Sequence, residues 1–186
     1  MTATIEQIAL KTADGVGATI GDYAGKVRLV VNVASKCGLT PQYTALEAVY
    51  RRYKARGFEV LAFPANEFGG QEPGTEAEIK AFCATTYDVT FPLFAKIVVK
   101  GSGQHPLYAA LTHARPEARA QPGSDFRAKL AGYGVPVGAP SEILWNFEKF
   151  VLDRKGAVVE RFAPDVVPDD PMVVAVIESE LAKPTA

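Results

Sequence analysis

Two apolar runs separated by a helical pattern dominate the first third of the chain. Residues 27–33 (VRLVVNV) and 58–63 (FEVLAF) are nearly continuous apolar stretches, which is typical of strands covered on both faces of a sheet. Between them, large side chains recur at helical spacing and predict a helix over residues 41–56, with Thr40 as its N-cap and Gly57 as its end. A strand, a helix and a strand of this length form a βαβ unit, so we expect the two strands to be parallel.

The later part of the chain adds two helices and a hairpin. Thr75 and Glu78 form a capping box ahead of a second amphipathic helix. Residues 145–152 (WNFEKFVL) and 156–162 (GAVVERF) are strand candidates joined by a tight turn, so we expect an antiparallel hairpin. A last helix is predicted to begin near Pro171 and to carry an apolar face inward.

Two less regular regions complete the plan. Short strands near residues 5–10 and 17–20 predict a β-hairpin at the N-terminus. A segment rich in Ala, Gly and Pro spans residues 101–140 and contains one short predicted helix at 105–114. Its remainder has few large apolar side chains, so we interpret it as an inserted surface segment. The sequence therefore predicts one thioredoxin-like α/β domain over residues 1–186, with a central mixed β-sheet flanked by helices.

Composition excludes several classes of protein. Hydrophobic residues make up 48% and charged residues 22%, as in ordinary globular proteins. The net charge is −1 and no basic stripe is present, so we expect neither nucleic-acid binding nor stable membrane association. The N-terminal residues lack the pattern of a secretory signal, which predicts a cytoplasmic location. The two cysteines are too few for a disulfide framework and do not form a CxxC metal motif.

Chain direction places several polar side chains at one edge of the predicted sheet. Cys37 follows the first parallel strand, and Gln71 lies in the loop that follows the second. Trp145 and Asn146 stand at the start of an antiparallel strand and therefore at the same edge. Ligands bind beyond the carboxyl ends of parallel strands in open α/β sheets. We therefore expect these four residues to converge on one site.

The residue types at this edge suit chemistry at a thiolate. A cysteine must lose its proton to act as a nucleophile, and the amino end of the following helix favours negative charge. Gln and Asn amides and the Trp indole donate hydrogen bonds but do not take up a proton at ordinary pH. They therefore fit the stabilisation of developing negative charge. The two histidines, His105 and His113, lie in the mid-chain segment, which favours a structural or surface role and argues against a Cys-His hydrolase.

Each candidate residue also has a purely structural interpretation. Cys37 can be a small buried hydrophobe, and Cys83 lies on the apolar face of its helix, where free cysteines commonly pack. Gln71 can serve turn formation, Trp145 the core and Asn146 the end of a strand. Their convergence favours the functional interpretation of the set.

Three motifs resemble the glutathione peroxidase family. They are a cysteine after an apolar strand, the loop at 63–75 with its GGQEPG sequence, and the WNFEKF strand. The resemblance extends over about residues 5–181. It implies that Cys37 is the peroxidatic cysteine and that Gln71, Trp145 and Asn146 complete a catalytic tetrad.

A further stretch (EIKAFCATTYDVTFP) resembles the helix that carries the resolving cysteine in bacterial non-selenium two-cysteine members. The resemblance implies that hydrogen peroxide or an organic hydroperoxide oxidises Cys37 to a sulfenic acid. Cys83 then forms a Cys37–Cys83 disulfide, which thioredoxin reduces, and no cofactor or metal is required. Two alternatives stay open: a glutathione-dependent peroxidase that does not use Cys83, and a peroxide sensor or redox relay that passes its disulfide to a partner protein.

The chain departs from many relatives next to the predicted site, where Ala65 and Glu67 replace cysteine and glutamine. Glu67 adds a carboxylate to that region. We also expect the helix over residues 76–87 to unwind locally on oxidation, because Cys83 faces the core and several weak helix formers follow it. The two sulfurs are expected to be too far apart to bond in the reduced protein.

Overall fold

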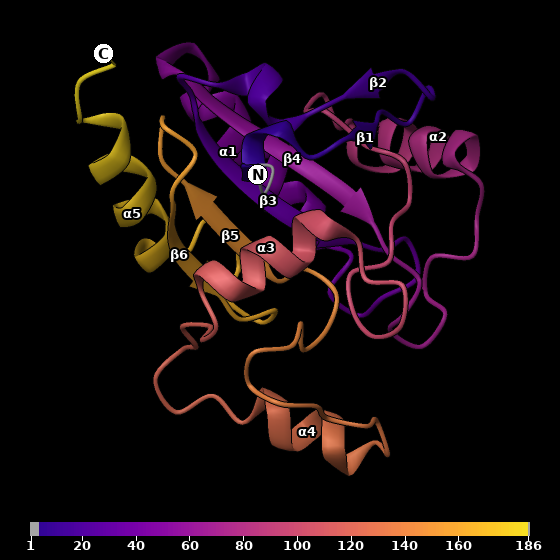
Figure 1. The fold of residues 1–186 in the computed structure, drawn as a ribbon. Coiled ribbons are helices and arrows are strands. Elements are labelled where there is room, and N and C mark those ends of the chain that lie inside the picture. Colours follow the sequence, from indigo (N-terminus) through magenta and orange to yellow (C-terminus); the bar gives the residue numbers. More distant parts are fainter. Residues whose placement is uncertain (1–3, 186) are drawn as a thin grey trace.

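A four-stranded mixed sheet forms the centre of the computed structural model, which describes residues 4–185 (Figure 1). Residues 1–3 and 186 of the predicted domain lie outside the described residues. The strand order is β4-β3-β5-β6. The strands are β3 (Val27–Val33), β4 (Phe58–Pro64), β5 (Lys149–Leu152) and β6 (Val158–Phe162). β3 and β4 are parallel, whereas β5 pairs antiparallel with both β3 and β6. The predicted βαβ unit and hairpin are confirmed, and the arrangement is thioredoxin-like.

Helices cover both faces of this sheet. They are α1 (Gln42–Tyr53), α2 (Glu76–Tyr87), α3 (Pro106–Ala114), α4 (Phe126–Gly132) and α5 (Pro171–Leu181). α3 crosses one face of the sheet (Figure 1). On this face the Tyr108 ring meets Phe63 and Phe150 edge-on. α1 lies on the opposite face. The ring of its Tyr53 packs edge-on against Phe58 of β4. Phe58 is five positions from Phe63, and because side chains alternate along a strand, the two point to opposite faces of the sheet. No helix within residues 4–185 is long and apolar enough to cross a membrane.

The boundaries of α1 differ from the prediction at its amino end. The helix begins at Gln42, and Thr40 does not cap it. The Thr40 hydroxyl is instead used inside the preceding loop, where it accepts a hydrogen bond from the Cys37 N–H at 3.0 Å. At the other end, a 3-10 turn over Lys54–Arg56 leads to Gly57, whose φ of 90° requires a residue without Cβ. The end of the helix was therefore predicted correctly.

The N-terminal strands are shorter than predicted. β1 (Leu10–Lys11) and β2 (Gly17–Ala18) form the expected antiparallel hairpin. Residues Ile5–Gln7 and Ile20–Tyr23, however, are 3-10 helices. Capping boxes at both 3-10 helices supply local hydrogen bonds that compete with strand pairing.

The second half of the chain contains two further differences. β5 begins only at Lys149, because Phe147 adopts a φ of 66° and interrupts the extended backbone. The inserted segment contains α4, which the sequence did not predict and which Figure 1 shows apart from the other helices. Leu130 is its buried residue. The helices predicted at 105–114 and near Pro171, and the capping box at Thr75, are present.

Candidate active site

Cys37 lies in a tight loop directly after β3. Its side chain is 8% exposed, and its sulfur accepts a hydrogen bond from the Leu39 N–H at 3.3 Å. Thr40 fixes the loop from inside, since its hydroxyl accepts from the Cys37 N–H and donates to the Ala34 carbonyl at 2.8 Å. The backbone N–H of Leu39 is therefore one hydrogen-bond donor that the loop directs at the Cys37 sulfur.

Gln71 connects this loop to the segment before β5. Its carbonyl accepts a hydrogen bond from the Lys36 N–H at 3.0 Å, one residue before Cys37. Its side-chain oxygen accepts from Asn146 Nδ2, also at 3.0 Å. Three segments that are distant in the sequence therefore meet at the carboxyl ends of β3 and β4, as the chain direction predicted.

Trp145 borders the same site. Its side chain is 9% exposed, and its ring lies 5.6 Å from that of Phe68 between centroids. A Cβ placed on Gly69 would lie 3.6 Å from both the Gln71 and Trp145 side chains, so these two side chains flank one glycine. Asn32 fixes the backbone beneath, because its Nδ2 donates to the Trp145 carbonyl at 3.1 Å.

Asn146 keeps an acceptor free at this edge. It is fully buried, and its Oδ1 has no hydrogen-bond partner within residues 4–185. Gln71, Trp145 and Asn146 thus lie together at the edge of the sheet where the Cys37 loop is attached. Their amide and indole N–H groups are of the kind that donates hydrogen bonds to a thiolate or to an oxygen bound to it.

Cys83 belongs to a different element, α2, and both cysteines are free. Cys83 is 2% exposed, and burial raises the pKa of its thiol to about 11, with a smaller contribution from the Glu72 carboxylate. The adjacent Tyr43 hydroxyl lowers this pKa and so opposes part of the shift. With both cysteines free, Cys83 is a buried neutral thiol. It lies on the side of α2 that faces the core, as predicted.

Pockets border α2 on two sides. One, of about 360 Å³, lies between α2 and the Cys37 loop and is lined by Lys36, Glu72 and Phe82 among others. Another, of about 470 Å³, is lined by Cys83 itself and by residues of the N-terminal hairpin, including Val16. α2 is therefore less tightly enclosed than the sheet, whose residues in β3 and β4 are all buried.

Carboxylates near the site are engaged in local contacts. Glu67 accepts a hydrogen bond from the Val99 N–H at 3.0 Å and so anchors the chain before α3. Glu72 is 1% exposed and accepts from the Ser35 hydroxyl at 3.1 Å, two residues before Cys37. Burial raises the pKa of Glu72, and the hydrogen bond from Ser35 partly opposes this.

The histidines do not take part in this site. His105 caps α3, since its Nδ1 accepts from the Leu107 N–H at 3.2 Å. His113 lies in the last turn of the same helix. The structural role predicted for His105 is confirmed.

Three residues at or next to the site were not predicted in the places where the structure has them. The sequence predicts Thr40 as a helix cap, whereas its hydroxyl fixes the Cys37 loop. Glu148 and Lys149 are completely buried next to Trp145 and Asn146. The signal was present in the sequence, because two opposite charges interrupt an apolar run that is otherwise suited to a central strand.

Comparison with known proteins identifies the family of the chain. The family described as "Glutathione peroxidase" matches residues 5–112. The chain is 50% identical to "Thioredoxin/glutathione peroxidase BtuE" of Escherichia coli over 98% of this chain and 100% of that protein. It is 46% identical to "Hydroperoxy fatty acid reductase gpx1" of Synechocystis sp., covering 90% of each.

A similar solved structure is that of Trgpx in its apo form. It is 32% identical, with a TM-score of 0.69 over 98% of this chain and 99% of that one. Family model, sequence relatives and structure agree over most of the length. The chain belongs to the glutathione peroxidase family of peroxidase enzymes.

Proposed function

We propose that this chain is a thiol peroxidase that reduces hydrogen peroxide and organic hydroperoxides through Cys37. The observation that carries the proposal is the bond from Asn146 to Gln71, whose own backbone is tied to the Cys37 loop. It holds two neutral amide side chains at the edge of the sheet that carries the Cys37 loop. The names of two relatives, a thioredoxin/glutathione peroxidase and a hydroperoxy fatty acid reductase, support the substrate class.

In the first step, the Cys37 thiolate attacks one oxygen of the peroxide and a new S–O bond forms. The O–O bond breaks, and the leaving alkoxide or hydroxide takes up a proton. Cys37 is thereby oxidised by two electrons to a sulfenic acid. The amides of Gln71 and Asn146 and the indole of Trp145 stabilise the developing charge, in the manner of preorganised donors elsewhere.

In the second step, Cys83 attacks the sulfenic sulfur of Cys37. The S–O bond breaks, water leaves, and the Cys37–Cys83 disulfide forms. This attack needs Cys83 as a thiolate, whereas burial holds its pKa at about 11. We propose that α2 opens locally to expose Cys83, and the pockets on both sides of α2 support this opening.

A dithiol reductant, thioredoxin, then returns two electrons and restores both thiols by disulfide exchange. The cycle requires the two cysteines and the reductant but no metal or organic cofactor. We place it in the cytoplasm, where such reductants keep thiols reduced.

A coupled peroxidase assay with thioredoxin or glutathione as the reductant tests this function. Wild-type protein and Cys83→Ser are compared at equal hydroperoxide concentration. We expect thioredoxin-dependent turnover in the wild type and its loss in Cys83→Ser. Equal turnover of both proteins with glutathione would instead assign a cycle without Cys83. A persistent mixed disulfide with a partner protein, without turnover, would assign a relay.

A further inference from the structure

Trp145 and Asn146 lie on a short segment that bends at Phe147. The φ of Phe147 is 66°, in a region that bulky side chains rarely adopt. Such conformations persist only where the surroundings hold them. Here the Phe147 N–H donates to the Asn32 carbonyl at 2.7 Å, and its buried ring packs edge-on against Tyr43 with 5.4 Å between centroids.

Lys149 holds the carboxyl end of this segment. Its side chain is fully buried, and its Nζ donates to the carbonyls of Phe147 and Pro164. Burial lowers the pKa of Lys149 to about 7, and the carboxylates of Glu148 and Asp165 only partly oppose this. A neutral amine still has two N–H groups, so both carbonyls keep a donor in either protonation state.

The Pro164 carbonyl connects Lys149 to the helix that follows Cys37. It also accepts a hydrogen bond from Gln42 Nε2 at 2.7 Å, and Gln42 is the first residue of α1. The amino group of Lys149 therefore joins the Trp145–Asn146 segment to the element whose amino end carries the Cys37 loop.

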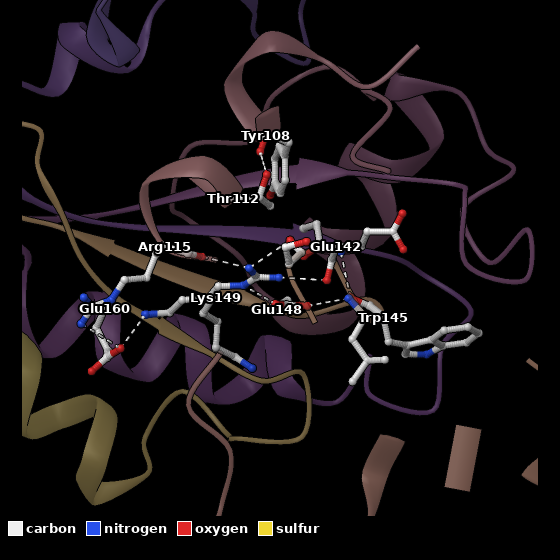
Figure 2. A network of polar contacts seen from close by, with 12 residues as sticks. Tyr108, Thr112, Arg115, Glu142, Trp145, Glu148, Lys149 and Glu160 are labelled. Atoms are coloured by element: carbon white, nitrogen blue, oxygen red, sulfur yellow. Dashed lines mark hydrogen bonds and ion pairs between the residues drawn. The ribbon is translucent and has the colours of Figure 1, made fainter. Parts of the chain in front are cut away.

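Glu148 holds the other end of the segment. Its Oε2 accepts a hydrogen bond from the Leu144 N–H at 2.7 Å, and its Oε1 accepts from Arg161 Nε at 2.6 Å. Glu148 and Arg161 are both fully buried. Figure 2 shows Glu148, Lys149 and Trp145 in this network, with the Lys149 amino group directed away from Glu148.

We propose that Glu148 and Lys149 are positioning residues for peroxide reduction, which hold the two ends of the 144–147 segment so that Trp145 and Asn146 face Gln71 and the Cys37 loop. This inference rests on the proposed function. An apolar side chain at Lys149 would avoid the burial of an amino group that makes no hydrogen bond to a carboxylate. The lysine is therefore explained by the two carbonyls that it fixes and not by packing.

Lys149→Met and Glu148→Gln test the proposal. Lys149→Met removes the amino group that donates to both carbonyls. Glu148→Gln leaves one acceptor oxygen where two carboxylate oxygens accepted from Leu144 and Arg161. Trp145 is the only tryptophan in the chain, so its emission reports directly on the segment. In both variants we expect a red-shifted emission in the reduced protein and stronger quenching by acrylamide. We also expect hydrogen peroxide to oxidise Cys37 more slowly, on the order of tenfold to a hundredfold.

Arg28→Met is the matched control. Arg28 is a fully buried cation at the opposite end of the same sheet, where it pairs with Glu6 at 2.6 Å. Its loss should lower stability but leave the Trp145 emission and the Cys37 oxidation rate unchanged. Should one test variant fail to fold, the other decides.

Variants at Glu148 or Lys149 that behave like Arg28→Met would overturn the proposal. Slower oxidation with unchanged emission would also overturn it, because Trp145 would not have moved. The emission is measured without peroxide. A wild-type protein whose Cys37 resists peroxide therefore refutes the proposed function, and the emission comparison still decides whether these residues position Trp145.

Discussion

Loosening α2 should accelerate formation of the Cys37–Cys83 disulfide. With a pKa of about 11, only about 0.01% of buried Cys83 is thiolate at pH 7, against about 3% for an exposed thiol with a pKa of about 8.5. This difference of roughly 300-fold corresponds to about 3 kcal/mol. Attack by Cys83 after α2 has opened is therefore faster than attack by the buried residue if the opening costs less free energy than this. Such a cost is modest for local unfolding.

The perturbation is the double variant with Ala81→Gly and Ala84→Gly. Both alanines are exposed on α2, and each change destabilises a helix by about 1 kcal/mol. Their sum makes the open helix roughly 30-fold more populated, because each 1.4 kcal/mol is about tenfold. Disulfide formation should accelerate by up to that factor.

The assay starts from protein whose Cys37 has been oxidised by one equivalent of hydroperoxide. Samples are alkylated at successive times, and the free Cys83 is measured by mass spectrometry. Ala175→Gly, at an exposed position of α5, is the matched control and should leave the rate unchanged. A double variant that forms the disulfide at the wild-type rate, while hydrogen exchange shows a more open α2, would refute the reasoning.

Three further predictions concern single residues of the site. Cys37→Ser should abolish peroxide turnover and leave the fold intact, as peroxidase assays and circular dichroism will show, because a hydroxyl is a far weaker nucleophile than a thiolate. Trp145→Phe and Asn146→Ala should each slow sulfenic acid formation in stopped-flow measurements, by at most about 2.7–4 kcal/mol of activation free energy; wild-type rates in both would mean that these residues only pack. The folded protein should lose stability as the pH rises from about 8.5 to about 11, because Cys83 loses its proton more readily in the unfolded chain; chemical denaturation should show a smaller loss in Cys83→Ala, and an equal loss would contradict the raised pKa.

The sheet and the meeting point of the site residues could be predicted because they depend on local pattern and chain direction. Residues of β3 and β4 are buried along their whole length and are mostly apolar, so little else competes with the strand. Parallel strands then bring the Cys37 loop and the Gln71 loop to one edge without any knowledge of side-chain contacts.

The missed features depend on hydrogen bonds that only the folded chain shows. The late start of β5 follows from the bend at Phe147, which the Asn32 carbonyl of β3 holds from a distant segment and the Lys149 amino group holds from two residues away. Thr40 has a residue type suited to a helix cap, and only the folded loop shows that Cys37 and Ala34 use its hydroxyl. That residues 1–186 form a single domain stays a prediction.

The most direct test of the central claim is the intact mass of the reduced protein after one equivalent of hydroperoxide. The account predicts that wild-type protein loses two hydrogen atoms, with Cys37 and Cys83 joined in one disulfide-linked peptide pair. Cys83→Ser should instead gain one oxygen atom, on Cys37. Wild-type protein whose mass does not change, or an oxygen gained at any residue other than Cys37, would contradict the account.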